Sequence, residues 1–403
     1  MRTATSIRPV KTDFDIAIGG LRRAMSLLAI WPQMQRRFHL TIIWLVYLIG
    51  FVIAILASYA GTLGTGKDLE RVVAGLGQSI PVTVIGVKYA LFKAQMSPLK
   101  SILEGMEDDW KNQKRSPTKE NDRVVMLSHA RISKIFFNLY TAIVMTCWGL
   151  FVVSPLARMI SHGIETRNST DFPMSSYYPF MTRQSSMYEI VYVFEVVWGT
   201  AMVIAHTSID GLLVAIIFHL CGQLEILRCR IEEFNTKEQT TDTMIAQIKG
   251  IVIKHEAIMN AARALEESFN HILLGQLLGG TFHICLAGFS ILQAMESSNP
   301  TAFVQFGLLL AMALQQMFIY SFAGDYLTTQ GAVIRMAVYK ANWYEVPPSV
   351  GRSFLLIMVR AARPMNVTAG KFSPMSLTSF TGLLKSAVSY LSVLRAMNRD
   401  KFN

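Results

Sequence analysis

The sequence predicts an all-α, polytopic membrane protein with seven transmembrane helices. Hydrophobic residues make up 52% of the 403 positions, and only 16% are charged, against ~25% in soluble domains. Seven stretches are almost free of charge: residues 38–66, 72–87, 135–157, 196–224, 268–295, 297–324 and 372–394. A spanning helix needs ~20 mostly apolar residues. The second stretch reaches that length, as Val72 to Leu91, if Lys88 snorkels to the membrane surface.

The basic residues of the connecting segments predict the orientation of these spans. The N-terminal 37 residues and the loops 93–134, 225–267 and 325–371 together hold 28 Lys and Arg, whereas the segments on the other side hold 8. Cytoplasmic loops carry the excess of Lys and Arg. We therefore expect a cytoplasmic N-terminus and an extracellular C-terminus, which is the reverse of a seven-helix metabotropic receptor.

The first span has no cleavable signal before it and is expected to act as its own insertion signal. After the second span, apolar residues follow helical spacing on both sides of Ser116-Pro117, which predicts two cytoplasmic helical extensions. The same spacing runs through residues 225–267, so helices four and five should project into the cytoplasm. Together these extensions predict an anchor bundle below the membrane. Between the third and fourth spans, Asn168-Ser169-Thr170 is a glycosylation sequon on the predicted outer side.

The fourth span opens with aromatic residues, among them Tyr188, Tyr192 and Trp198, beside Glu189 and Glu195. Such residues belong at membrane interfaces, but they also fit a small apolar ligand pocket in the outer half of the bundle.

The fifth span contains a GxxxG spacing, Gly275 to Gly279, for which we expect close packing within the chain more than a dimer face. Spans five and six should form a tight hairpin around residues 296–300. The four cysteines fit neither an extracellular disulfide framework nor a zinc pattern.

Two charged residues lie inside predicted spans, where charge usually marks function. Asp210 is expected to cap or to form a salt bridge with a neighbouring helix, and the alternative is an ion contact. Lys385 lies in a polar stripe of the last span with Ser386 and Ser389. Packing against other helices and a water-filled pathway explain that stripe equally well. The sequence has no catalytic motif, which argues against an enzyme, and it indicates neither a metal, a cofactor nor a nucleic-acid partner.

The stretch Ala369 to Arg395, AGKFSPMSLTSFTGLLKSAVSYLSVLR, closely resembles the seventh-segment signature of insect odorant receptors. Four further stretches resemble landmarks of that family in the right order, so the resemblance covers residues 200–395 well. Related gustatory receptors keep a tyrosine like Tyr390, but their later pair is replaced here by Ala396-Met397. The four stretches are FHLCGQLEILRCRI, KHEAIMNAARALEESFN, FIYSFAGDYLTT and VYKANWYEVPPS.

The resemblance implies the odour-tuned subunit of a ligand-gated, non-selective cation channel in olfactory sensory neurons. It implies a heterotetramer with a shared co-receptor, whose long insertion between spans four and five this chain lacks. The last helix would line the pore, with Ser389 on its polar stripe, a hydrophobic gate at Val393 and Leu394 and an exit at Arg395. Arg395 departs from what a cation exit needs, because its charge repels cations. The odorant, a small, volatile, hydrophobic molecule, is expected to contact outer-half residues of spans two to six: Ile80, Val84, Trp148, Phe151, Tyr192, Val196, Gly199, Phe289, Phe306 and Leu309.

The expected organisation divides the chain into five parts. A cytoplasmic segment, 1–37, precedes six spans with the ligand pocket and cytoplasmic helix extensions, 38–324. A cytoplasmic anchor segment, 325–371, leads to the pore-lining helix, 372–397, and to an extracellular tail, 398–403. We expect a multi-pass protein of the plasma membrane of neuronal dendrites, in contact with lipids. The alternatives are a gustatory-type channel, a metabotropic receptor and a transporter, but we find neither the internal repeats nor the broken helices of a transporter.

Overall fold

The computed structural model describes residues 13–34, 37–64, 69–114, 120–162, 172–174, 176–178, 187–234 and 240–399. Nearly all of them are helical. The helices are α1 (Asp13–Leu27), α2 (Phe38–Gly64), α3 (Leu69–Ala94), α4 (Met96–Lys114), α5 (Glu120–His162), α6 (Met187–Glu232), α7 (Thr241–Glu296), α8 (Pro300–Lys340), α9 (Pro348–Ala361) and α10 (Leu377–Arg399). Strands β1 (Thr368–Ala369) and β2 (Ser373–Pro374) form a short antiparallel pair.

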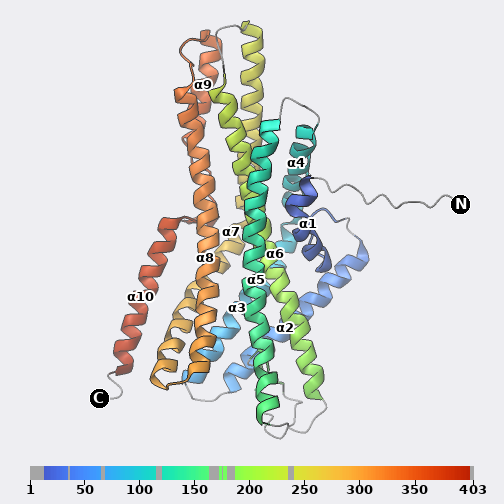
Figure 1. Ribbon diagram of the computed structural model, residues 1–403, viewed down its shortest axis with the longest axis vertical. Coiled ribbons are helices and arrows are strands. Elements are labelled where there is room, and N and C mark those ends of the chain that lie inside the picture. The colour runs from blue at the N-terminus through green and yellow to red at the C-terminus, as the bar shows by residue number, and fades with distance from the viewer. Residues whose placement is uncertain are drawn as a thin grey trace, which may run out of the picture.

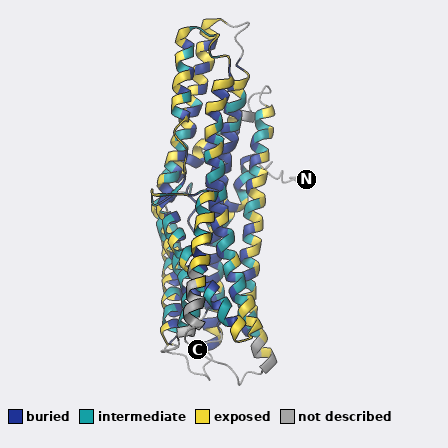
Figure 2. Cartoon of the chain, turned by 90° about the vertical axis from the view of Figure 1, so that its left-hand side faces the viewer, coloured by how far each residue is buried: buried dark blue, intermediate teal, exposed yellow. Residues whose placement is uncertain are grey.

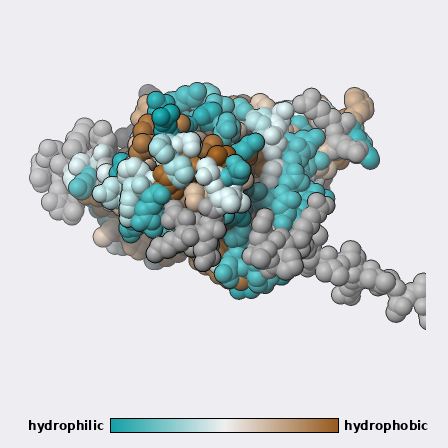
Figure 3. Space-filling view, turned by 90° about the horizontal axis from the view of Figure 1, so that it is seen from above, coloured by the Kyte–Doolittle hydropathy of each residue, from teal (hydrophilic) through white to brown (hydrophobic). Residues whose placement is uncertain are grey.

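The helices form one elongated bundle (Figure 1). α5, α6, α7 and α8 run along its length, with α9 at the upper end of this view and the turn between α7 and α8 at the lower end. α7 has 56 residues and is therefore about 84 Å long at 1.5 Å per residue, far more than the ~30 Å of a bilayer core. The predicted extension of helices four and five beyond the membrane is thus present as the upper half of the bundle. Seen from above, this end exposes mostly hydrophilic residues (Figure 3).

Six helices in the described part of the chain are long and apolar enough to cross a membrane: α2, α3, α5, α6, α7 and α8. The chain is a multi-pass membrane protein. α10 occupies the position of the seventh expected span, and its 23 residues reach about 35 Å. Its serines and Lys385 make it more polar than the other six. α1 was not predicted, and it packs against α5 and α6.

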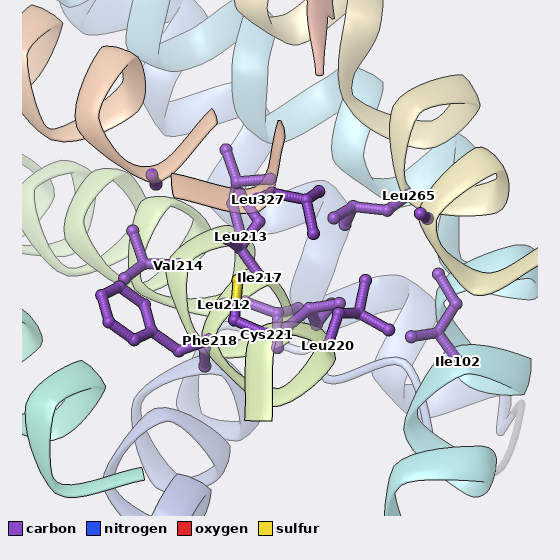
Figure 4. Packing of buried hydrophobic residues seen from close by; sticks show 14 of the residues in the cluster. Ile102, Leu212, Leu213, Val214, Ile217, Phe218, Leu220, Cys221, Leu265 and Leu327 are labelled. Atoms are coloured by element: carbon purple, nitrogen blue, oxygen red, sulfur yellow. The ribbon is translucent and has the colours of Figure 1, made fainter. Parts of the chain in front are cut away.

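α6 is the central helix. Of the apolar window that qualifies it as a span, 94% is buried, whereas the corresponding windows of the other five helices are 17% to 44% buried. Leu213 and Ile217 of α6 meet Leu327 of α8, with Leu265 of α7 nearby (Figure 4). The outer faces of the other helices are exposed (yellow in Figure 2), and many of the exposed side chains there are apolar, such as Ile53, Leu139 and Phe282. These faces are suited to lipid.

Local sequence determines how the helices end and how closely they approach. The predicted hairpin between α7 and α8 is present. At its turn, the Asn299 side chain accepts a hydrogen bond from the Ala302 amide (3.1 Å), and Pro300 is the first residue of α8, so both residues favour the start of a helix there. Of the GxxxG pair, Gly279 packs within the chain, because a Cβ there would lie 2.3 Å from a Val84 methyl group on α3. Nothing lies within 4 Å of such a Cβ at Gly275.

Candidate ligand site and polar core

An aromatic cluster joins α6 to the segment that precedes it at the lower end of the bundle. The ring of Phe172 stacks on that of Tyr188 with centroids 5.0 Å apart, and Tyr188 stacks on Tyr192 at 6.1 Å. The Tyr192 hydroxyl donates a hydrogen bond to the Val152 carbonyl of α5. Apolar packing and this one polar contact therefore hold α5, α6 and the segment together.

Glu195, further along α6, also binds the same segment. Its side chain is buried, with 1% of the residue exposed. One carboxylate oxygen accepts from the Met174 amide (3.1 Å), and the other accepts from the Tyr178 hydroxyl (3.3 Å). Buried carboxyl groups require such partners. The segment 172–178, as far as it is described, is thus tied to α6, and the Tyr177 amide donates to the Ala57 carbonyl of α2 (2.9 Å).

Beside this cluster lies a cavity of about 780 Å³ between α3, α5 and α8, open on one side. Phe151, Phe172 and Phe306 form apolar parts of its wall, and Gln78 and Gln305 supply polar groups. A mostly apolar wall with a few polar groups, in this range of volume, is typical of small-molecule sites. The remaining lining residues are Ala74, Leu150, Val153, Ser154, Pro155, Pro173, Pro300, Thr301, Val304 and Leu308.

Trp148 packs next to this region against α6. Its indole nitrogen donates to the Thr200 hydroxyl (3.0 Å), and a Cβ built on Gly199 would lie 2.2 Å from its ring. Any side chain at Gly199 would therefore displace Trp148. The absence of a side chain at Gly199 leaves the space that the indole ring occupies.

A buried polar network lies deeper in the bundle and joins four helices. Lys88 of α3 forms a salt bridge with Asp210 of α6, both side chains being at most 3% exposed. Lys88 also donates to the Tyr320 hydroxyl of α8 (3.1 Å) and lies 3.3 Å from His206 Nδ1. The Tyr140 hydroxyl of α5 donates to Asp210 (3.1 Å).

Further hydrogen bonds enclose Asp210 and extend the network to α7. Tyr320 donates to one carboxylate oxygen of Asp210, and the Gln316 amide donates to the other (3.0 Å). The Gln276 amide of α7 donates to the Gln316 carbonyl oxygen (2.6 Å). A buried ion pair is tolerated when its remaining sites are hydrogen-bonded in this way. Lys88 follows Gln78 of the cavity by ten residues, so the network lies about 15 Å along α3 from the cavity.

The network corrects one expectation and decides another. Lys88 does not snorkel to the membrane surface, because Asp210 draws its ammonium group into the bundle, where 2% of the residue is exposed. For Asp210, a cap or a salt bridge to a neighbouring helix was expected, with an ion contact as the alternative, and the structure has the salt bridge, to Lys88 of α3.

α10 packs on α7 and α8. Ala387 is buried there against Ile284, Ala313 and Met317. Lys385 and Ser389, in contrast, are exposed. At 100° per residue, Thr381, Lys385, Ser389 and Ser392 lie within about 40° of Lys385, whereas Ala387 lies about 160° away. The polar stripe therefore faces away from this chain, so packing within the chain does not explain it.

The predicted odorant contacts fall into separate groups. Phe151 and Phe306 line the cavity, and Tyr192 belongs to the aromatic cluster with Val196 packed against it. Trp148 and Gly199 pack on each other, and Val84 packs on Gly279. Ile80 and Phe289 are half-buried and Leu309 is buried.

Some predicted positions lie outside what the structure describes. Val393, Leu394 and Arg395 lie on α10, but their side chains are not among those described. Asn168 lies outside the described residues.

The sequence indicated Asp210 as a salt-bridge residue, but it did not indicate its partner Lys88, the other members of the polar network or most of the cavity wall. Phe172 lies in a connecting segment without periodicity, so no pattern indicated it. Gln78 and Gln305, in contrast, stand as lone amides in apolar stretches, a signal that could have found them.

The fold and the cavity together define a multi-pass membrane protein with a candidate small-molecule site. The model of the family described as 7tm odorant receptor matches residues 68–388. The chain belongs to this family, which is a family of receptors and not of enzymes.

Known proteins resemble the chain along most of its length. Odorant receptor 13a of Drosophila melanogaster is 26% identical over 288 residues, 68% of this chain and 69% of that protein, and Odorant receptor 82a is 22% identical over 61% and 63%. The chain thus spans just under two thirds of the second relative. The olfactory receptor OR5 of Machilis hrabei, solved in complex with eugenol, superposes with a TM-score of 0.79 over 96% of this chain and 100% of that one, at 16% identity.

Proposed function

We propose that the chain is the odorant-binding subunit of a ligand-gated, non-selective cation channel in the dendrites of olfactory sensory neurons. Its ligands would be small, volatile, hydrophobic molecules, and its partner would be a co-receptor subunit in a heterotetramer. The observation that carries the channel proposal is the exposed polar face of α10, with Lys385, Ser389 and Ser392 on it. Lipid does not stabilise such a face, but water or a polar partner does.

The proposed pore follows from the shape of α10. The helix is long enough to cross the bilayer core, and its apolar face is fixed to α7 and α8. When several subunits surround one axis with these polar faces inward, a hydrated path results. Val393 and Leu394 would form the narrow gate that blocks ions by dewetting.

The proposed odorant site is the cavity beside the aromatic cluster. Its volume of about 780 Å³ accommodates a small volatile molecule, as does the fold of OR5, which was solved with eugenol. The ligand would be stabilised by buried apolar area at ~25 cal/mol per Å², and Gln78 or Gln305 would orient a polar group. The network of Lys88 and Asp210 lies between this site and the upper half of the bundle.

Cysteine accessibility tests the pore. Cells express the chain with an insect co-receptor, and currents evoked by odorants are recorded before and after a charged methanethiosulfonate reagent. Ser389→Cys should be modified and the current reduced, whereas Ala387→Cys, on the buried face of the same turn, should be unaffected. Equal modification of both positions, or of neither with odour-evoked current present, would contradict the assignment of α10 as the pore helix.

A further inference from the structure

A second cavity, of about 520 Å³, lies where α2 begins, α3 ends and α4 begins. It is on the opposite side of the membrane domain from the odorant cavity, because α3 runs between the two. Its lining contains three basic residues, Arg37, Lys93 and Lys100, and no acidic residue. The other lining residues are Ala29, Pro32, Met34, Leu40, Thr41, Met96 and Ser97.

The basic side chains are held around this cavity from different elements. Lys93 donates to the Ala29 carbonyl (3.1 Å), and its ammonium group lies 5.7 Å from the ring centre of Trp44. Lys100 has 54% of its side chain exposed and forms a long contact to Glu104 (3.7 Å), which contributes little to stability at a surface. Glu104 does not line the cavity, so the lining residues carry three basic groups and no acidic one.

Backbone and hydroxyl groups complete an environment that suits phosphate. Met96 and Ser97 are the first two residues of α4, a helix of 19 residues. Pro98 has no amide hydrogen and the Leu99 amide donates to the Gln95 carbonyl (3.4 Å), so the amides of Met96 and Ser97 are the ones that this helix N-terminus can offer to an anion. The hydroxyls of Ser97 and Thr41 add donors. Basic side chains together with a helix N-terminus form a common anion-binding arrangement.

The surface next to the cavity is apolar. Thr41, which lines the cavity, lies on the same side of α2 as Leu45 and Val52, within about 40° at 100° per residue, and these two side chains are 42% and 46% exposed. The apolar side begins next to the cavity and continues along the membrane-spanning part of α2. An anionic group in the cavity would thus have a surface for hydrocarbon chains directly beside it, which a free phosphate ion does not need.

We infer that this cavity binds the headgroup of an anionic phospholipid, whose acyl chains lie along the exposed face of α2. Basic pockets between helices at the membrane surface are suited to phosphorylated lipid headgroups. The site contacts α3 and α4, so the bound lipid would fix the junction between the membrane domain and the upper bundle. The inference is independent of the channel proposal.

Lipid binding to the purified full-length protein tests the inference. Dioctanoyl phosphatidylinositol 4-phosphate should raise the thermal unfolding midpoint saturably, and dioctanoyl phosphatidylcholine, with the same chains, should not. Replacing all three basic residues, as Arg37→Gln/Lys93→Gln/Lys100→Gln, should weaken the apparent affinity on the order of a hundredfold, since each such charge contributes roughly fivefold. The matched control, Arg131→Gln/Lys134→Gln/Arg263→Gln, removes three exposed charges elsewhere and should bind like wild type.

A single variant keeps the test valid if the triple variant does not fold. Lys100→Gln changes an exposed side chain and should weaken binding roughly fivefold. Inorganic phosphate that stabilises the protein as well as the lipid does would overturn the lipid assignment in favour of a free anion. Equal loss of binding in the control variant would overturn the site, because general surface charge would then explain the effect.

Discussion

Replacing Lys88 by methionine tests the role of the buried network most sharply. Methionine has a similar length but no charge, so Asp210 would remain buried with 2% of the residue exposed. Breaking one side of a buried ion pair costs about 3–5 kcal/mol. Tyr140, Gln316 and Tyr320 still donate to the carboxylate, so we expect the lower value, about 3 kcal/mol.

The assay is thermal unfolding of the purified protein followed by fluorescence-detected size exclusion. Lys88→Met should lower the midpoint on the order of 5 °C or more. The control Lys134→Met removes an exposed lysine away from both cavities and should change stability by less than about 0.5 kcal/mol. The double variant Lys88→Met/Asp210→Asn should lose less than the sum of the two single losses. Additive losses, or a Lys88→Met midpoint equal to that of wild type, would refute the account of the network.

Three other predictions concern packing, pH and ligand size. Gly324→Ala should prevent normal assembly of α10, because the new Cβ would lie 2.3 Å from the Met375 backbone oxygen; surface expression checks this, and wild-type levels would contradict it. Asp109 is desolvated, which raises its pKa, but hydrogen bonds and charge from His219 and Lys254 outweigh this and hold its pKa below the ordinary value. Asp109→Asn should therefore lower the unfolding midpoint at pH 7, and the difference from wild type should shrink as the pH falls through that lowered pKa; a difference that grows in acid would contradict the argument. Phe306→Ala should weaken responses to small odorants about tenfold at unchanged surface expression, and an unchanged dose-response curve would exclude Phe306 from the site.

The spans and the long helices could be predicted from sequence because apolar length and helical spacing are local properties. The hairpin at residues 296–300 was likewise encoded by Asn299 and Pro300. The helix α1 was not predicted from sequence, because a 15-residue segment with four charged residues is too short and too polar to indicate a membrane span. Its burial depends on packing against α5 and α6.

The partners within the core could not be predicted from sequence. Lys88 and Asp210 are 122 positions apart, and their pairing depends on how α3 and α6 pack, so snorkelling was an equally reasonable expectation. The cavity wall has the same difficulty, because Phe172 and Phe306 come together only through the packing of a connecting segment on α8. Periodicity identifies the buried face of a helix but does not identify which buried residues leave a space.

We propose that an odorant opens a cation pathway that this chain forms together with a co-receptor. Whole-cell current under a panel of volatile compounds, in cells with and without the co-receptor, measures this most directly. A fast inward cation current is expected in the presence of both subunits, and the potency of the odorant should change on substitution of Phe306 but not of exposed Lys134. A broad panel that evokes no current, with both subunits demonstrated at the cell surface, would contradict the claim.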